Sequence, residues 1–104
     1  MIADGHTPVP GFKHPLYGHH GVDGLYFNGR PPPKYIVMEA KYHKSSYGWT
    51  KNDGKQMSDK WIEKKIVNQL SGDALDDFEL EGYAKIGLRY IPDIGKSVKE
   101  VITW

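Results

Sequence analysis

The chain has 104 residues, a formal net charge of +1 and no cysteine. This length suits one domain with a modest core, and the absence of cysteine excludes disulfides and thiolate metal sites, so any metal would need His, Asp, Glu or backbone oxygen ligands. No apolar run approaches the ~20 residues that cross a bilayer, and the start of the chain lacks the features of a signal peptide, so we expect a soluble domain.

Charge is unevenly distributed along the chain. Residues 30–65 carry nine Lys or Arg against four Asp or Glu, whereas residues 66–83 carry five acids and no base. The basic middle suits a polyanionic partner such as nucleic acid, although ordinary solvated surface explains so small an imbalance equally well.

The first half of the chain predicts a hairpin. Residues 1–20 show no clear period, and we expect irregular chain there with one short strand near Val9–Phe12. Residues 21–28 alternate in a way that favours a strand with Asp23 near its middle. The three prolines after the Asn-Gly pair break this pattern, and the apolar run at 35–42 then predicts the second strand of the hairpin.

The next stretch predicts a loop and a helix. Residues 43–55 are polar and turn-rich, so we expect a mobile loop, and a helix follows it. Asp53 or Ser58 could begin this helix, which should end at the Ser-Gly-Asp sequence at 71–73. Its apolar face, at helical spacing, consists of Met57, Trp61, Ile62, Ile66 and Leu70.

A second short helix over 73–83 and two strands near 84–91 and 97–103 complete the expected elements. Acidic residues in the first turn of that helix suit the helix dipole. This order of elements predicts an α/β (α+β) domain with a mixed sheet and a hairpin flanked by one or two helices. We expect residues 1–104 to form that single domain.

The end of the second hairpin strand holds two charged residues. Glu39 and Lys41 lie two apart on a strand, so they share one face of the sheet. Burial of either charge alone costs on the order of several kcal/mol. The two could simply pair with each other or lie at an exposed edge, and Asp23 offers a different explanation if the hairpin places it beside Glu39.

Two carboxylates held close together repel each other unless a cation or a proton lies between them. Asp23 and Glu39 are therefore candidate ligands of a divalent metal, and their hard oxygens suit Mg²⁺ or Mn²⁺, with Zn²⁺ a further option. A metal ion lowers the pKa of an attacking water, and Lys41 beside it would stabilise the negative charge that develops on a phosphodiester. The pattern indicates metal-dependent phosphodiester hydrolysis.

These residues resemble the signature of the PD-(D/E)XK nucleases, the restriction-endonuclease-like superfamily. The first acid lies in VDG at 22–24, without the usual preceding proline, and the E-x-K motif lies in VMEAK at 37–41. An acid on one hairpin strand, E-x-K at the end of the next and a helix after it match the order in the superfamily, and some members carry a Gln near the start of that helix. The catalytic residues that the resemblance implies, in a small restriction-endonuclease-like core, are Asp23, Glu39, Lys41 and Gln56.

A closer resemblance is to the toxin domains at the C-termini of bacterial polymorphic toxins of the contact-dependent inhibition, Rhs and type VI effector types. It covers residues 18–65, and the tail fits only loosely. It implies a small nuclease at the C-terminal end of a larger chain. Such a toxin is secreted or delivered by the producing bacterium, acts in the cytoplasm of the target cell and is neutralised by a cognate immunity protein. Many superfamily members add an acid from an N-terminal helix, whereas only Asp4 precedes Asp23 here.

Several further polar residues are candidates for the site. His19 or His20 could bind metal or act as a general base, and both could equally lie in an exposed loop. Gln56 could orient the attacking water or contact phosphate, and capping of the helix is an equal alternative. The residues that could stack on bases or bind phosphates, or else form surface or partner contacts, are Lys44, Tyr47, Trp49, Lys51 and Lys55.

Three hypotheses for function follow from the sequence. The first is a Mg²⁺- or Mn²⁺-dependent endonuclease toxin whose substrate is DNA. The second keeps the fold but cleaves tRNA or another RNA, and nothing in the sequence recognisably reads a 2′-hydroxyl or a base edge. The third is a non-catalytic module that binds nucleic acid or a protein, which the presence of all three signature residues disfavours.

Overall fold

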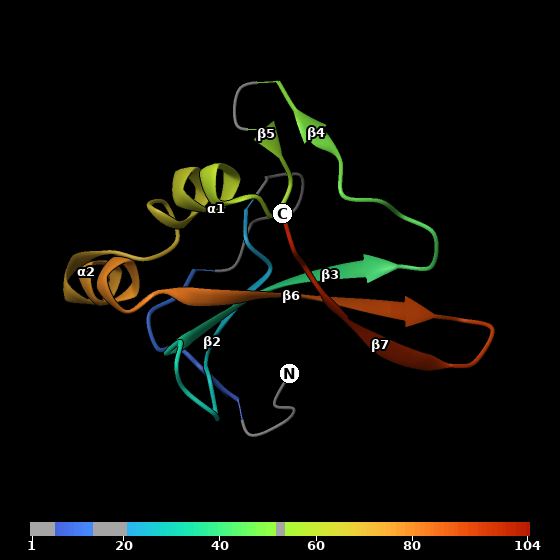
Figure 1. The fold of residues 1–104 in the computed structure, drawn as a ribbon, viewed down its shortest axis with the longest axis horizontal. Helices are drawn as coiled ribbons and strands as arrows, with labels where there is room; N and C mark the ends of the chain where they lie inside the picture. Colours follow the sequence, from blue (N-terminus) through green and yellow to red (C-terminus); the bar gives the residue numbers. More distant parts are fainter. Residues whose placement is uncertain (1–5, 14–20, 52–53) are drawn as a thin grey trace.

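The computed structural model describes residues 6–13, 21–51 and 54–104, and Figure 1 shows its ribbon. The strands in these ranges are β1 (Thr7–Pro8), β2 (Gly24–Phe27), β3 (Tyr35–Tyr42), β4 (Trp49–Thr50), β5 (Gly54–Lys55), β6 (Tyr83–Ile91) and β7 (Lys96–Val101). The helices are α1 (Asp59–Ile66) and α2 (Gly72–Glu81). At 8 and 10 residues, both described helices are too short to span a bilayer.

Five of these strands form one mixed sheet in the order β1-β2-β3-β6-β7. Neighbouring strands are antiparallel except β3 and β6, which run parallel from Tyr35 opposite Tyr83 to Tyr42 opposite Tyr90. A parallel pair needs a long crossover connection, and the segment that contains α1 and α2 supplies it. The structure confirms the predicted small α+β domain, with a mixed sheet, a β2–β3 hairpin and two helices.

The main core lies between the helices and one face of the sheet. Side chains alternate along β3, so Tyr35 and Val37 face the helices while Ile36 and Met38 face the opposite side. Trp61 is almost fully buried, which confirms its predicted place in the core. The buried residues of this helix-side core are Val9, Val22, Leu25, Tyr35, Val37, Met57, Trp61, Ile62, Ile66, Leu70, Phe78 and Ile102.

Helix α1 is shorter than the predicted helix. Its N-cap is Ser58, whose hydroxyl accepts a hydrogen bond from the backbone N–H three residues later at 3.3 Å. The other candidate cap, Asp53, lies outside the described residues. The helix ends at Ile66, so Met57 and Leu70 reach the core from outside it. The apolar spacing therefore identified the buried residues correctly and overestimated the length of the helix.

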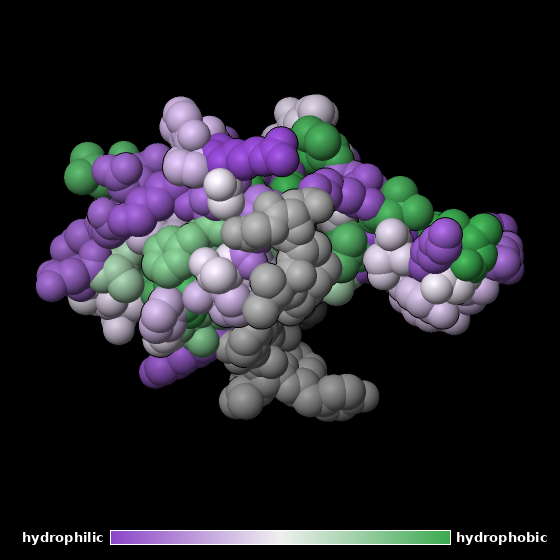
Figure 2. All heavy atoms as spheres, turned by 90° about the horizontal axis from the view of Figure 1, so that it is seen from below, coloured by the Kyte–Doolittle hydropathy of each residue, from purple (hydrophilic) through white to green (hydrophobic). Residues whose placement is uncertain are grey.

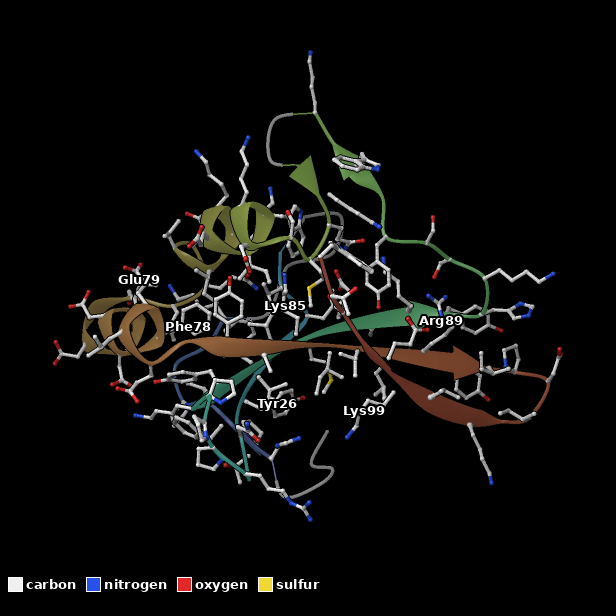
Figure 3. The ribbon with its side chains drawn as sticks, in the orientation of Figure 1. Tyr26, Phe78, Glu79, Lys85, Arg89 and Lys99 are labelled. Atoms are coloured by element: carbon white, nitrogen blue, oxygen red, sulfur yellow. The ribbon has the colours of Figure 1, made fainter. Side chains whose placement is uncertain are left out.

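Helix α2 is anchored to the sheet by aromatic and charged contacts. The ring of Phe78 stacks on Tyr83 with the centroids 4.9 Å apart, and Figure 3 shows Phe78 beside the sheet. Lys34 Nζ and the Tyr35 hydroxyl both donate to Asp77 Oδ2, at 2.6 and 2.5 Å. These two hydrogen bonds lower the pKa of Asp77. The predicted second helix is confirmed, and it begins one residue before the predicted range.

Two strand predictions were wrong in their placement. The short N-terminal strand is Thr7–Pro8 and not Val9–Phe12, because the Pro-Gly sequence at 10–11 turns the chain. Asp23 directly precedes β2 and does not lie in its middle. Its carboxylate accepts the backbone N–H of Ala40, so a side chain takes the place of a further backbone pair.

The segment predicted as a loop over 43–55 contains the small β4–β5 hairpin. Trp49 pairs with Lys55 in antiparallel register. The backbone N–H of Gln56 extends this pairing by donating to the carbonyl oxygen of Gly48 at 2.8 Å. This segment has no apolar periodicity, but it forms regular strands because the backbone groups of β4 and β5 pair with each other.

Strand β7 is an edge of the sheet, and its residues are mostly exposed. Lys96 and Lys99 lie on either side of Val98, one of the two exposed valines of this strand. Figure 2 shows a similar mixture, with apolar residues in green among hydrophilic residues in purple at the end of the molecule that the β6–β7 hairpin forms. Charged residues on an edge strand discourage pairing with another chain.

The side chain of Gln69, in the segment after α1, forms hydrogen bonds with the backbone just before Asp23. Its side chain is buried, and Oε1 accepts the Val22 N–H at 2.8 Å while Nε2 donates to the carbonyl oxygens of Val22 and Lys13 at 2.7 and 3.0 Å. A Cβ on Gly21 would lie 3.0 Å from this amide, so the glycine permits the close approach. Gln69 therefore fixes the backbone from which Asp23 projects.

We expect Gln69→Leu to lower the free energy of unfolding by about 2–3 kcal/mol, because it leaves the N–H and C=O groups of Val22 buried without partners. Urea denaturation measures this change. The control is Asn68→Ala at the exposed neighbouring position, which should change stability by less than about 0.5 kcal/mol. Equal stability of Gln69→Leu and the wild type would contradict the bridging role of the amide.

Candidate active site

Glu39 is a buried carboxylate at the end of an apolar strand. It follows four buried residues of β3 and is itself only 3% exposed. It faces the helix side of the sheet, since it lies two residues after Val37. Burial of an ionised carboxylate is costly unless other groups compensate for it, so the groups around Glu39 decide its chemistry.

Asp23 lies beside Glu39. Extension of the β2–β3 register by one pair puts the two residues opposite each other, and Asp23 Oδ2 accepts the backbone N–H of Ala40 at 2.8 Å. Burial, the hydrogen bond with Asp23 and the charge of Asp23 raise the pKa of Glu39 far above its usual range, and Lys41 opposes this only in part. Two carboxylates in contact cannot both remain ionised without a compensating cation.

The side chain of Gln56 bridges Glu39 and Lys41. Its Nε2 donates to Glu39 Oε2, and its Oε1 accepts from Lys41 Nζ at 2.6 Å. These two bonds fix the orientation of the amide, because only its oxygen can accept from an ammonium group. Gln56 does not cap α1, whose N-cap is Ser58. Its side chain therefore belongs to this polar site.

The backbone next to Gln56 has an unusual conformation. Met57 has a φ of 70°, in the left-handed region that residues other than glycine rarely adopt, and its side chain is fully buried. The packing of Met57 in the core offsets the local strain. This buried anchor holds the adjacent Gln56 in the position from which it reaches Glu39.

Lys41 is half-buried at the end of β3. Its ammonium group lies 4.8 Å from the centroid of the Tyr47 ring and donates to Gln56. A direct ion pair between Lys41 and Glu39, one of the explanations considered from the sequence, is not among the ion pairs of the described residues. The amide of Gln56 instead links the two side chains through one hydrogen bond to each.

Comparisons of the chain with protein-family models, with curated protein sequences and with solved structures found no match. The resemblance to PD-(D/E)XK nucleases and to toxin domains therefore rests on the sequence motifs. Function has to be inferred from the side chains that meet at the end of β3.

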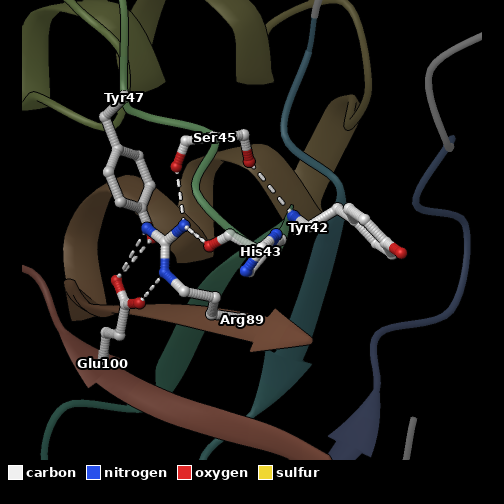
Figure 4. A network of polar contacts seen from close by, with 6 residues as sticks. All are labelled: Tyr42, His43, Ser45, Tyr47, Arg89 and Glu100. Atoms are coloured by element: carbon white, nitrogen blue, oxygen red, sulfur yellow. Dashed lines mark hydrogen bonds and ion pairs between the residues drawn. The ribbon is translucent and has the colours of Figure 1, made fainter. Parts of the chain in front are cut away.

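A second polar network, drawn in Figure 4, anchors the loop that follows β3. Arg89 on β6 forms an ion pair with Glu100 on β7, and its Nη1 donates to the carbonyl oxygens of His43 and Ser45 at 2.7 and 2.6 Å. The Tyr47 hydroxyl donates to Glu100 Oε2 at 3.5 Å. The hydrogen bond to Glu100 raises the pKa of Arg89. The network holds the loop against the sheet beside the two carboxylates.

Gly87 allows Tyr47 to lie between the two networks. In the sheet it pairs with Glu39 on one side and with Glu100 on the other. A Cβ at Gly87 would lie 1.8 Å from the Tyr47 hydroxyl oxygen, so no side chain fits there. Burial and the nearby charge of Glu100, with a smaller effect of Glu39, raise the pKa of Tyr47 to about 12. The hydroxyl is therefore protonated at neutral pH.

We expect Gly87→Ala to displace Tyr47 and to lower the free energy of unfolding by about 1–2 kcal/mol. Urea denaturation measures this change. Gly48→Ala is the control, because a Cβ at Gly48 meets nothing within 4 Å. A loss of equal size in both variants would contradict the specific role of Gly87.

Trp104, near the C-terminus, contacts Gln56 and Tyr47. Its indole Nε1 donates to the carbonyl oxygen of Gln56 at 2.9 Å, and its ring meets the Tyr47 ring edge-on with the centroids 5.1 Å apart. The ammonium group of Lys55 lies 3.8 Å from the Trp104 ring centroid. Trp104 therefore contacts both Tyr47 and Gln56, the two residues that hold the Lys41 ammonium group.

The residues predicted to bind nucleic acid have different surroundings. Trp49 is 79% exposed, and Lys44 and Lys51 are also exposed, so these three can meet a ligand directly. Tyr47 and Lys55 make the ring contacts described above, and both are half-buried. Their role in binding nucleic acid stays a prediction.

The donor set fits a divalent cation. Asp23 and Glu39 offer hard carboxylate oxygens in contact, and Mg²⁺ commonly takes one or two carboxylates and completes its shell with water and substrate phosphate. Catalytic zinc takes three protein ligands, and no group of three His, Cys, Asp or Glu side chains lies together among the described residues. The hard carboxylate oxygens of Asp23 and Glu39 suit Mg²⁺ or Mn²⁺. His19 and His20 lie outside the described residues, so their roles stay predictions.

Several residues that support the site were not predicted from the sequence, namely Gln69, Gly87, Arg89, Glu100 and Trp104. Gly87 interrupts an apolar strand pattern, and a glycine inside a strand signals a close approach, so this one could have been found. Arg89 and Glu100 are opposite charges on neighbouring strands, which become a pair only once the register is known.

Proposed function

We propose that the chain is a metal-dependent endonuclease that hydrolyses phosphodiester bonds, with DNA as its substrate. The observation that carries the proposal is the convergence of four side chains at the end of an otherwise buried strand, namely Asp23, Glu39, Lys41 and Gln56. A buried carboxylate in contact with a second carboxylate lowers stability, and such perturbed groups cluster at functional sites.

The chain's own groups are arranged for this chemistry. A divalent cation held by Asp23 and Glu39 would lower the pKa of an attacking water and neutralise charge on the phosphate. A backbone N–H orients the Asp23 carboxylate and the Gln56 amide orients the Glu39 carboxylate, so both are positioned before substrate binds. Lys41, held by Gln56 and Tyr47, offers an ammonium group where negative charge develops in the transition state.

Exposed residues in the segment after β3 suit a polyanionic substrate. Lys44 lies in the loop between β3 and β4, Lys51 directly follows β4, and the Trp49 ring on β4 is open to solvent. Aromatic rings stack on bases without regard to sequence, and lysines contact phosphates. These features support nucleic acid as the substrate class, with little selectivity for base sequence.

The test is a nicking assay on supercoiled plasmid with the wild type and Glu39→Ala, in Mg²⁺, in Mn²⁺ and in excess EDTA. We expect cleavage only by the wild type and only with a metal present. Total tRNA is incubated in parallel. Cleavage of tRNA alone would replace DNA with RNA as the substrate, and full cleavage in saturating EDTA would overturn the metal-dependent mechanism.

Absence of cleavage under all metal conditions would favour the third hypothesis, a binding module. In that case the wild type should still retard DNA in a salt-sensitive manner, because binding to phosphates releases counterions. Binding without cleavage by a correctly folded wild type would therefore end the proposal of catalysis.

We extend the proposal to a toxin that is delivered between bacteria, acts in the cytoplasm of the target cell and is neutralised by an immunity protein. The sequence resemblance supports this role. Induced expression of the wild type in a bacterium should stop growth, and expression of Lys41→Ala should not. Equal growth of both strains at matched protein levels would contradict the toxin role while leaving the nicking assay unaffected.

A further inference from the structure

A second polar pocket lies apart from the carboxylate site. Its volume is about 370 Å³, and the described residues that line it are His6, Asn28, Arg30 and Lys99. Pockets of this size hold small ligands or parts of larger ones. Every one of these side chains carries N–H donors, and no acid is among the described lining residues.

The pocket lies on the other side of the sheet from the carboxylate site. Lys99 pairs with Leu88, which belongs to the apolar cluster opposite the helices, whereas Glu39 faces the helices. Figure 3 shows Lys99 pointing away from α1 and α2. His6 precedes β1, and Arg30 belongs to the connection between β2 and β3. A ligand in this pocket would therefore not compete with one at Glu39.

His6 provides a fixed donor. Its side chain is more than nine-tenths buried, and its Nδ1 accepts the backbone N–H of Gly29 at 3.1 Å. Because Nδ1 accepts, the proton of the neutral ring is on Nε2. Each fully buried side-chain nitrogen or oxygen among the described residues has a hydrogen-bond partner. No described group pairs with Nε2 of His6, and His6 is among the residues that line the pocket.

Arg30 provides a guanidinium group at the pocket. The turn is fixed by the Arg30 backbone N–H, which donates to Asn28 Oδ1 at 3.0 Å, and by Asn28 Nδ2, which donates to the carbonyl oxygen of Pro33 at 2.8 Å. Among the described residues, no side chain pairs with the guanidinium group of Arg30. Lys99 also lines the pocket. The pocket therefore combines a rigid turn with an available guanidinium group.

We infer that this pocket binds a phosphate group. A phosphate presents several acceptor oxygens and negative charge, and guanidinium groups bind it through paired N–H donors. The buried His6 N–H and the Asn28 amide add directional donors that a patch of surface lysines lacks. The inference does not depend on the proposed nuclease activity. The phosphate can come from a free phosphate or phosphomonoester, or from the phosphodiester backbone of a nucleic acid.

The test follows the backbone amides of Gly29 and Arg30 by NMR while inorganic phosphate is added to the full chain at constant ionic strength. We expect saturable shifts of these amides. Arg30→Ala should weaken binding about tenfold or more, since a charged hydrogen bond is lost from an exposed residue whose removal leaves the fold intact. Lys96→Ala is the matched control, because it removes one positive charge from β7 on the opposite face of the sheet.

Two oligonucleotides then identify the source of the phosphate, in EDTA so that no strand is cleaved. An oligonucleotide that shifts the two amides only when it carries a 5′-phosphate indicates a phosphomonoester, and equal shifts without that group indicate the phosphodiester backbone. Shifts with inorganic phosphate alone indicate a small free ligand. Absence of saturable shifts, or an equal effect of Arg30→Ala and Lys96→Ala, would overturn the inference.

Discussion

Replacing Lys41 by Ala should slow phosphodiester cleavage by about 10²–10³-fold, the usual cost of removing a group that stabilises charge in a transition state. The ammonium group of Lys41 is held close to the carboxylates by Gln56 and the Tyr47 ring. Because it is half-buried and forms no described ion pair, its loss should lower the free energy of unfolding by less than about 1 kcal/mol. Single-turnover plasmid cleavage and urea denaturation measure the two quantities.

Lys60→Ala is the control for the loss of one positive charge. Lys60 is exposed on α1, so its removal should leave the cleavage rate within about twofold of the wild type, with only a small change in salt dependence. A Lys41→Ala variant that cleaves as fast as Lys60→Ala would exclude Lys41 from the chemistry. Loss of cleavage together with unfolding would instead assign Lys41 a structural role.

Replacing Glu39 by Gln should raise stability and abolish cleavage. In metal-free buffer the wild type buries one carboxylate against another, whereas a Gln at this position can donate to Asp23 and accept from Gln56. We expect the free energy of unfolding to rise by about 1–2 kcal/mol, the gain commonly seen when a strained functional group is removed. For a domain of this size the melting temperature should rise by at least about 4 °C.

Addition of Mn²⁺ should make the wild type more stable than Glu39→Gln. A cation that binds only the folded wild type stabilises it by about 2.7 kcal/mol at a concentration of 100 times Kd, and Glu39→Gln should gain much less. Glu100→Gln is the matched control, because the same chemical change removes the negative charge that pairs with Arg89 and weakens the hydrogen bonds from Arg89 and Tyr47, so it should destabilise the protein. A loss of stability in Glu39→Gln without metal would show that the carboxylate is structural.

The order of the elements was predictable because the local signals were strong. The apolar run at 35–42 predicted β3 with the bounds that the structure has, and the Pro-rich break after the first strand predicted the hairpin. The length of α1 was not predictable from spacing, because Met57 and Leu70 pack in the core from backbone outside the helix. Apolar periodicity reports burial and cannot by itself report backbone conformation.

The carboxylates, Lys41 and Gln56 were predictable as a group, since strand alternation and the hairpin register bring the first three together. The residues that support the site, such as Gly87, were not predictable. Gly87 lies between Glu39 and Glu100 only because β3 pairs in parallel with β6, and no local pattern specifies that pairing. The positions of residues that depend on pairing between distant strands therefore cannot be predicted from the sequence alone. The positions of residues at the ends of a predicted hairpin can.

The parallel pairing of β3 with β6 also has a kinetic consequence. The two strands are separated by a crossover that includes both helices, and closing so long a loop costs entropy before any contact repays it. The hairpin and helices can form early in refolding, but Gly87 and Glu100 join Glu39 only when this last alignment occurs. A partly folded chain would then contain most of its regular backbone before the residues around Glu39 are assembled.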